Sequence, residues 1–156
     1  MIESMNLISK LLPAENILLD AESTSKKRVF ERVAVLFENS HQIARSQVFD
    51  SLFAREKLGS TGLGQGVAIP HGRVKNLRDG SAAFVKTQHP IPFDSPDGQP
   101  VNLIFVLLVP ERATDVHLQL LAELAQMFSD KTFREQLQKC DDPAAIHQMF
   151  SNWKAE

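Results

Sequence analysis

What the chain has little of narrows the classes of protein it can belong to. Cysteine is nearly absent from the 156 residues, since Cys140 stands alone, so no intrachain disulfide and no cysteine-based metal site can form. Neither sign of charge dominates, because 17 Lys and Arg stand against 19 Asp and Glu. That balance gives no reason to expect nucleic acid or an anionic membrane as the main partner.

Long apolar runs are missing as well. The longest, around Leu103–Val109, is far too short to span a bilayer, so no membrane insertion is expected. The first ten residues carry Glu3 and lack a basic stretch followed by a long apolar run, so they do not resemble a signal peptide. With 43% hydrophobic residues, we expect one domain over residues 1–156 with a substantial core, in the cytoplasm.

The spacing of apolar residues predicts a layered α/β domain. It predicts strands at 16–19, 82–88 and 101–109, and a helical turn at 7–12. Helices are predicted at 47–58, 130–140 and 143–153. Two more helices begin at capping residues: one runs from Thr24 or Ser25 to about Asn39, and one from Thr114 to 129. The strand at 101–109 is almost continuously apolar, which is typical of a strand covered on both faces. The order of the elements predicts a mixed sheet flanked by helices.

Between the first two predicted strands, from the end of the helix predicted over 47–58, lies a segment of different composition. Residues 55–72, REKLGSTGLGQGVAIPHG, hold five of the seven glycines of the chain. Gly62, Gly64 and Gly66 alternate, so an extended conformation leaves one face without side chains and open to close approach by another surface. Neither GxxxxGKS/T nor a GxGxxG that opens a helix is present, which makes a nucleotide-binding loop a poorer explanation.

His71 is the candidate for chemistry in this segment. Pro70 restricts the backbone before it and Gly72 is expected to free the backbone after it, so His71 is expected on a defined turn with little steric cover. A neutral imidazole offers a nitrogen nucleophile near physiological pH, which suits a phosphoryl carrier. The alternative is an ordinary surface histidine, and the surrounding motif favours the functional interpretation.

A phosphoryl site also needs groups that hold phosphate oxygens. Arg55, in the last turn of the predicted helix 47–58, offers a forked guanidinium, or it is a cation that interacts with the helix dipole. Lys57 has the same two interpretations. Ser60 and Thr61 offer hydroxyls and backbone N–H groups, with plain turn chemistry as the alternative.

His117 is the second histidine of interest. It lies in the first turn of the helix predicted after the long strand, four residues before Leu121 and seven before Leu124, so it is expected on the inward face. Helix N-termini attract anions, and sites in α/β sheets favour the region beyond strand ends. His117 is therefore a candidate donor to a phosphoryl oxygen, with a histidine satisfied at the edge of the core as the alternative.

The other histidines, His41, His89 and His147, are expected at the surface. A metal site shared by His71 and His117 is not supported by any compact ligand spacing, and neither a metal nor a cofactor is expected.

A modest partner surface is expected around His71, because contacts with a phosphocarrier must be brief. Leu63, Val67 and Ile69 are candidates for its apolar contacts, although a strand alternates faces and places some of them in the core.

The segment REKLGSTGLGQGVAIPHG closely resembles the active-site signature of enzyme IIA proteins of the phosphoenolpyruvate phosphotransferase system, in the fructose, mannitol and nitrogen-regulatory class. The likeness covers nearly the whole chain and includes LVPERATDVHLQLLAELA, which is similar to the second-histidine segment of that family. This resemblance implies a type-2 EIIA fold with a mixed, roughly five-stranded sheet and no cofactor.

The resemblance also implies roles for individual residues. His71 corresponds to the histidine that is phosphorylated, on its tele nitrogen, by a small histidine phosphocarrier, either HPr or its nitrogen-branch counterpart NPr. His117 corresponds to the second active-site histidine and Arg55 to the phosphate-binding arginine, while Ser60 and Thr61 remain candidates for phosphate contacts. Where mannitol-type members commonly carry Glu six residues before the active histidine, this chain has Gln65.

Three functions remain open from the sequence. Gln65, the freestanding chain and the GSTG segment favour the nitrogen-regulatory branch, a phosphocarrier whose phosphorylation state regulates targets such as potassium-transport or sensor kinase proteins. The second is a sugar-specific transferase that passes phosphate to a separate IIB protein. The third is a binding module that has lost phosphoryl transfer, which intact His71, His117 and Arg55 oppose.

Overall fold

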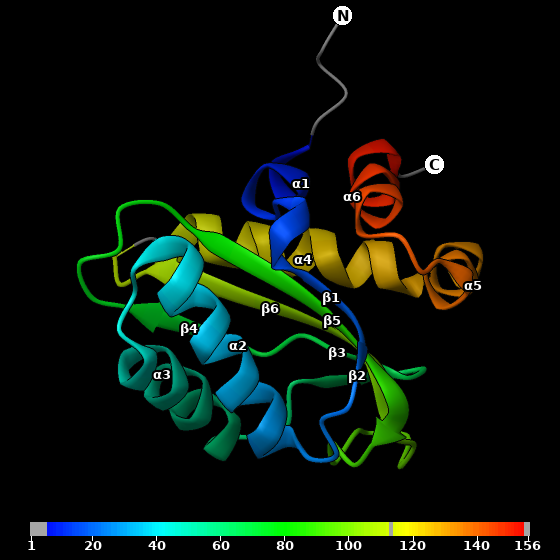
Figure 1. The fold of residues 1–156 in the computed structure, drawn as a ribbon, viewed down its shortest axis with the longest axis horizontal. Helices are drawn as coiled ribbons and strands as arrows, with labels where there is room; N and C mark the ends of the chain where they lie inside the picture. The colour runs from blue at the N-terminus through cyan, green and yellow to red at the C-terminus, as the bar shows by residue number, and fades with distance from the viewer. Residues whose placement is uncertain (1–5, 113, 155–156) are drawn as a thin grey trace, which may run out of the picture.

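One mixed sheet with helices on both faces makes up the fold (Figure 1). The computed structural model describes residues 6–112 and 114–154. Its strands are β1 (Ile17–Ala21), β2 (Gly62–Gly64), β3 (Val67–Ala68), β4 (His71–Val74), β5 (Ser81–Ile91) and β6 (Val101–Pro110). Its helices are α1 (Leu7–Leu11), a 3-10 turn (Ala14–Asn16), α2 (Lys26–His41), α3 (Arg45–Lys57), α4 (Thr114–Ser129), α5 (Lys131–Lys139) and α6 (Pro143–Asn152). The predicted α/β class and mixed sheet are confirmed.

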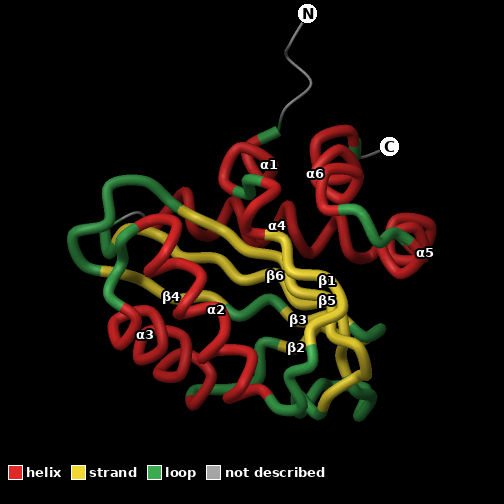
Figure 2. The backbone as a smooth tube through the Cα atoms, in the orientation of Figure 1, coloured by secondary structure: helices red, strands yellow, loops and turns green. Residues whose placement is uncertain are grey.

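The strand order is β1-β5-β6-β3-β2, and β4 also pairs with β6 (Figure 2). β5 and β6 form the long antiparallel pair at the centre, while β1 runs parallel to β5. β3 and β4 both run parallel to β6, and β2 folds back antiparallel to β3. The described sheet has six strands, of which β2 and β3 are only three and two residues long, so it is close to the five that were expected.

Two apolar clusters lie on opposite faces of this sheet, as the apolar character of residues 101–109 predicted. Alternate residues of β6 enter each cluster, because successive side chains of a strand point to opposite faces. On one face β6 packs with α2 and α3, through a cluster that includes Phe30, Phe37, Leu52, Ile104, Val106 and Leu108. On the other face it packs with α1, α4, α5 and α6, through a cluster that includes Ile8, Leu103, Phe105, Leu107, Leu124, Phe128 and Phe150.

The helix ends follow ordinary capping chemistry. The Ser25 hydroxyl accepts the backbone N–H of Arg28, so it caps α2 as predicted, and Asp130 caps α5 through the N–H of Phe133. α2 extends two residues beyond the predicted end, to His41, and α3 begins two residues before the predicted start. The predicted capping role of Thr114 concerns a side chain outside the described residues. Among the described residues, no helix has the length and apolarity that crossing a membrane requires.

The C-terminal end of α5 is held by a buried cation from the sheet. Lys86, on β5, is 7% exposed, and its ammonium donates to the carbonyls of Leu137, Gln138 and Cys140 at 3.1, 3.0 and 2.7 Å. The last carbonyls of a helix have no partner within the helix, so this ammonium satisfies them. A single strand residue therefore fixes the position of α5 against the sheet.

Replacing Lys86 with methionine is expected to destabilise the fold by about 1–3 kcal/mol, because buried carbonyls lose their donor. The free energy of unfolding in urea measures the effect. Lys139→Met is the matched control, since Lys139 is exposed at the same helix end, and its effect should stay within about 0.5 kcal/mol. Equal stability of the Lys86→Met variant and the wild-type chain would contradict this assignment.

Helix α3 approaches β4 closely at Gly72. A Cβ atom at this position would overlap the Ser51 hydroxyl and lie 3.0 Å from the Ser51 carbonyl carbon. Gly72 therefore provides room for a helix, and the expectation that it frees the backbone after His71 was wrong, since its φ is not among the positive values. The buried Ser51 hydroxyl has no hydrogen-bond partner among the described residues.

Gly72→Ala is expected to destabilise the chain by about 1–3 kcal/mol, because the added methyl overpacks the contact with α3. Ser51→Ala in the same chain should restore part of this loss, since it removes an unpartnered hydroxyl from the crowded contact. Ser51→Ala alone should be close to neutral. Urea unfolding of the two single variants and the double variant tests the coupling, which additive effects would disprove.

Candidate functional site

His71 lies where one long strand is interrupted. In β3, Val67 pairs with Leu103 of β6, and in β4 His71 pairs with Leu107, so both segments keep the same register along β6. The Pro70 carbonyl continues the ladder by accepting the N–H of Leu107 at 2.9 Å. Pro70 has no N–H to donate, which explains the break between β3 and β4. His71 therefore opens a strand, and the expectation that it lies on a turn was wrong.

The His71 and His117 rings lie side by side. Their centroids are 4.9 Å apart and the ring planes meet at 62°. Strand alternation places His71 on the same face as the buried Ile69, which belongs to the cluster beneath α4. His117 lies in the first turn of α4 and is 7% exposed, so the prediction that it faces inward is confirmed.

The His71 ring is oriented by its own backbone. Its Nδ1 lies 2.9 Å from the carbonyl oxygen of Ile69. A carbonyl oxygen only accepts hydrogen bonds, so Nδ1 carries the ring proton in the neutral imidazole. That tautomer leaves the lone pair on Nε2, the tele nitrogen, and His71 is half-buried. The side chain therefore presents a neutral nitrogen nucleophile in a fixed orientation.

Both histidines are held neutral. The pKa of His71 is lowered, and burial is the largest cause. The hydrogen bond to Ile69 and the charge of Glu56 raise this pKa, while the charge of Arg55 lowers it. Burial also lowers the pKa of His117, to about 4, with further lowering by His71, Arg73 and Arg55. Both rings are therefore uncharged near neutral pH. The buried Nδ1 of His117 has no hydrogen-bond partner among the described residues.

Arg55 lies on the helix that covers the other face of the sheet. It lies in the last turn of α3, and its charge lowers the pKa of both rings. Its Nη1 donates to the Gly59 carbonyl at 2.8 Å, in the turn that follows the helix. His71 and His117 therefore come together at the β4 edge of the sheet, and Arg55 lies at the end of the helix that packs against β4.

Ser60 and Thr61 shape the turn beside this cluster. The Ser60 hydroxyl donates to the Phe93 carbonyl at 2.5 Å and accepts the N–H of Gly62 at 3.0 Å. The buried Thr61 donates its hydroxyl to Glu56 at 2.7 Å and its backbone N–H to the same carboxylate at 3.0 Å. Both hydroxyls thus have partners within the fold, and their role as phosphate ligands stays a prediction.

Two charged groups of this region were missed in the sequence. Arg73 lies two residues after His71 on the same face of β4, and its charge lowers the pKa of His117. Strand alternation signals this residue once residues 71–74 are recognised as a strand. Glu56 is 8% exposed and forms an ion pair with Lys26 at 2.8 Å. Only the tertiary contact between α2 and α3 reveals that Glu56 is buried.

The remaining candidates separate into surface and core. His41 and His89 are exposed, as predicted, whereas His147 is half-buried and places a ring nitrogen 3.2 Å from the Ser9 carbonyl, so its assignment to the surface was wrong. Lys57 is exposed and lies over the Phe53 ring, 5.1 Å from its centroid.

The three apolar candidates for a partner surface differ in exposure. Val67 is 0% and Ile69 is 4% exposed, so both belong to the core, while Leu63 is 44% exposed. Only Leu63 of the three is therefore available to another molecule.

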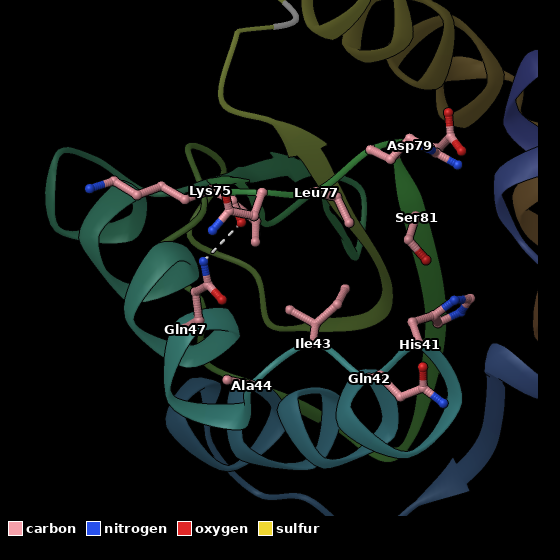
Figure 3. A pocket seen from close by; sticks show the side chains of 13 residues that line it. His41, Gln42, Ile43, Ala44, Gln47, Lys75, Leu77, Asp79 and Ser81 are labelled. Carbon is pink, nitrogen blue, oxygen red and sulfur yellow. Dashed lines mark hydrogen bonds between the residues drawn. The ribbon is translucent and has the colours of Figure 1, made fainter.

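A cavity of about 420 Å3 lies at the far end of β4, between the start of α3 and the loop before β5. Figure 3 shows Ile43, Leu77 and Ser81 pointing into it, and the Gln47 amide donating to the Lys75 carbonyl. Neither His71 nor His117 is among its lining residues. Within residues 6–112 and 114–154, no three His, Cys, Asp or Glu side chains gather closely enough to hold a metal ion.

The lowered histidine pKa values predict a pH dependence of stability. In the unfolded chain both rings would titrate near 6.5, whereas His117 in the fold titrates at about 4. The unfolded state therefore binds more protons between these values, so stability is full above pH 6.5 and falls as the pH drops toward 4. His117→Gln should flatten the stability profile in this window, with exposed His89→Gln as the control. Imidazole NMR titration checks it directly, and an unshifted His117 pKa would contradict it.

The chain is similar to known proteins over most of its length. The sequence profile of the phosphoenolpyruvate-dependent sugar phosphotransferase system EIIA 2 family matches residues 10–153. A nitrogen regulatory protein of Pseudomonas aeruginosa is 39% identical over 143 residues, which cover 91% of this chain and 93% of the relative.

Solved structures resemble the fold as well. The nitrogen regulatory protein IIA-Ntr of Neisseria meningitidis superposes with a TM-score of 0.89 at 50% identity, covering 93% of this chain and 99% of that one. The mannitol IIA of Escherichia coli shares the fold with a TM-score of 0.75 at 20% identity, over 88% of this chain and 97% of that one. The chain therefore belongs to the EIIA type-2 family of the phosphoenolpyruvate-dependent sugar phosphotransferase system.

Proposed function

We propose that this chain is a phosphoryl carrier of the nitrogen-related phosphotransferase branch, which accepts a phosphoryl group on Nε2 of His71. The observation that carries the proposal is the hydrogen bond from Nδ1 of His71 to the Ile69 carbonyl, at 2.9 Å. It commits the ring proton to Nδ1 and leaves the Nε2 lone pair for nucleophilic attack. Full-length similarity to proteins named nitrogen regulatory protein supports this branch.

The transfer step balances without a cofactor. The Nε2 lone pair of His71 forms a new N–P bond to the phosphorus atom of a phosphohistidine on the donor protein. The N–P bond of the donor breaks, and its electron pair returns to the donor imidazole. The proton on Nδ1 of His71 stays in place and continues to donate to Ile69. In such a transfer the protein mainly aligns the groups and stabilises the equatorial oxygens.

His117 and Arg55 are proposed to bind the transferred group. His117 lies beside His71 and is uncharged near neutral pH, because its pKa is about 4, so it has one N–H to donate to a phosphoryl oxygen. The Arg55 guanidinium supplies a positive charge and several N–H donors. Ser60 and Thr61 are further proposed phosphate contacts, although their hydroxyls serve the turn in the unphosphorylated fold.

The proposed donor is an HPr-like phosphocarrier, in particular the nitrogen-branch NPr. Large apolar side chains are exposed on segments next to the site: Leu58 directly after α3 is 84% exposed, and Leu118 next to His117 is 62% exposed. Leu63 on β2 is 44% exposed. Exposed apolar groups of this kind suit a brief protein contact. We further propose that the phosphorylation state of His71 regulates targets such as potassium-transport or sensor kinase proteins.

A transfer assay with radiolabelled phosphoenolpyruvate, enzyme I and either HPr or NPr tests the proposal. The wild-type chain should become labelled, His71→Ala should not, and the label should be acid-labile as expected for phosphohistidine. Arg55→Gln and His117→Gln should each accept label about 100-fold more slowly, because each loses a donor to the developing charge. His89→Ala is the matched control, since His89 is an exposed histidine on β5.

The same assay separates the alternatives. Faster labelling by NPr than by HPr supports the nitrogen branch. Rapid passage of label from the chain to a fructose or mannitol IIB protein would favour the sugar-specific alternative. Labelling of His71→Ala at the wild-type rate, or no labelling of the wild-type chain by either carrier, would refute the proposed function.

A further inference from the structure

We infer that Glu56 is the positioning residue of the phosphoryl site, because one buried carboxylate fixes the turn that holds both Arg55 and His71. This inference rests on the proposed function and names a residue that acts through others. Glu56 follows Arg55 in the last turn of α3, and its side chain is 4% exposed. Burying a carboxylate costs folding free energy unless hydrogen bonds or an opposite charge compensate it, so Glu56 needs partners for each of its oxygens.

The carboxylate is fully engaged. It accepts the Thr61 hydroxyl at 2.7 Å and the Thr61 backbone N–H at 3.0 Å. The Lys26 ammonium, from the first residue of α2, donates to it at 2.8 Å. Lys26 is itself held over the Phe93 ring, 4.7 Å from its centroid, and 3.6 Å from Asp94. Glu56 thus ties the end of α3 to α2 and to residue 61.

From Thr61 a chain of hydrogen bonds leads to the nucleophile. The Thr61 carbonyl accepts the N–H of Ile69 at 3.0 Å, and the Ile69 carbonyl accepts Nδ1–H of His71 at 2.9 Å. The tautomer of His71 therefore depends on the carbonyl of Ile69, a residue whose own N–H is held by Thr61. Glu56 holds Thr61 at two atoms, so it fixes the start of this chain.

The turn after α3, which contains Gly59, also binds the Arg55 side chain. The Gly59 N–H donates to the Glu56 carbonyl at 3.1 Å, and the Gly59 carbonyl accepts Nη1 of Arg55 at 2.8 Å. The turn is thus fixed at one end by the helix backbone and at the other end by the Glu56 carboxylate. If that carboxylate is lost, both Arg55 and His71 lose support together, and misplacement by an ångström already slows such chemistry strongly.

Glu56 could instead serve stability alone, as a buried ion pair with Lys26. The two roles predict different kinetics. A purely structural role predicts loss of stability with an unchanged transfer rate in the folded fraction. A positioning role predicts a lower maximal rate of phosphoryl acceptance at unchanged apparent KM for the carrier, because the buried Glu56 offers little surface to a partner.

The test uses the full chain with Glu56→Gln, Thr61→Val and Thr61→Ser. Glu56→Gln and Thr61→Val should lower the maximal rate of label transfer by about 10- to 100-fold, with the apparent KM for the carrier within about twofold of wild type. Thr61→Ser keeps the hydroxyl and the N–H and should restore most of the rate. Lys86→Met is the matched control, because it removes a buried cation that binds the end of α5 and not the turn beside His71. It should lower stability without slowing transfer by folded protein.

A double-mutant cycle with Arg55→Gln sharpens the result. If Glu56 acts through Arg55 and His71, the Arg55→Gln and Glu56→Gln variants combined should lose less rate than the product of the single losses. Imidazole NMR should show the His71 pKa falling in Glu56→Gln, since the Glu56 charge raises it. Wild-type rates in folded Glu56→Gln and Thr61→Val would overturn the inference, as would an equal loss in Lys86→Met.

The experiment also separates this inference from the proposed function. Failure of the wild-type chain to take label from either carrier refutes the proposed function alone. Imidazole NMR then decides whether Glu56 positions His71: an altered Nδ1–H resonance in both Glu56→Gln and Thr61→Val, but not in Thr61→Ser, supports it. Unchanged His71 signals in all three variants refute it.

Discussion

The pairing of one interrupted strand with β6 determines where chemistry can occur in this fold. β3 and β4 keep a single register along β6, and the break at Ile69–Pro70 lies between them. Because the register is kept, His71 must face α4, as Ile69 does, and the Ile69 carbonyl is left free of the ladder to orient its ring. β4 is also an edge strand, and α3, which ends in the turn that contains Arg55, packs against it.

The neutrality of the two histidines follows from this placement. Packing between the sheet and α4 removes both rings from water, which lowers their pKa values, and nearby arginines lower that of His117 further. A nucleophile and a neutral donor are therefore present together near neutral pH, beside cations that suit an anionic group. The proposed phosphoryl group would add negative charge where the charges of Arg55 and Arg73 already act on His117, so the fold supplies cations before phosphorylation.

Much of this could be predicted from the sequence, and what could not has a common cause. Apolar spacing predicted the helices, the covered strand β6 and the inward direction of His117, because these depend on local periodicity. The resemblance to the enzyme IIA family, and no local periodicity, predicted that His71, His117 and Arg55 belong to one site. The strand at His71 and the burial of Glu56 depend on partners far along the chain, Leu107 and Lys26, and no local pattern contains that information.

The glycines show the same limit most clearly. Their alternation predicted a bare face that another surface approaches, and the approaching surface belongs to this chain. A Cβ at Gly62 would lie 2.5 Å from the Ser95 hydroxyl, and one at Gly64 would lie 3.3 Å from the Asp97 carboxylate. Asp97 also accepts the N–H of Gln65 at 2.9 Å. The face without side chains therefore allows the loop before β6 to pack closely against the β2–β3 turn. Contacts within the fold thus determine the shape of this segment in the absence of a partner.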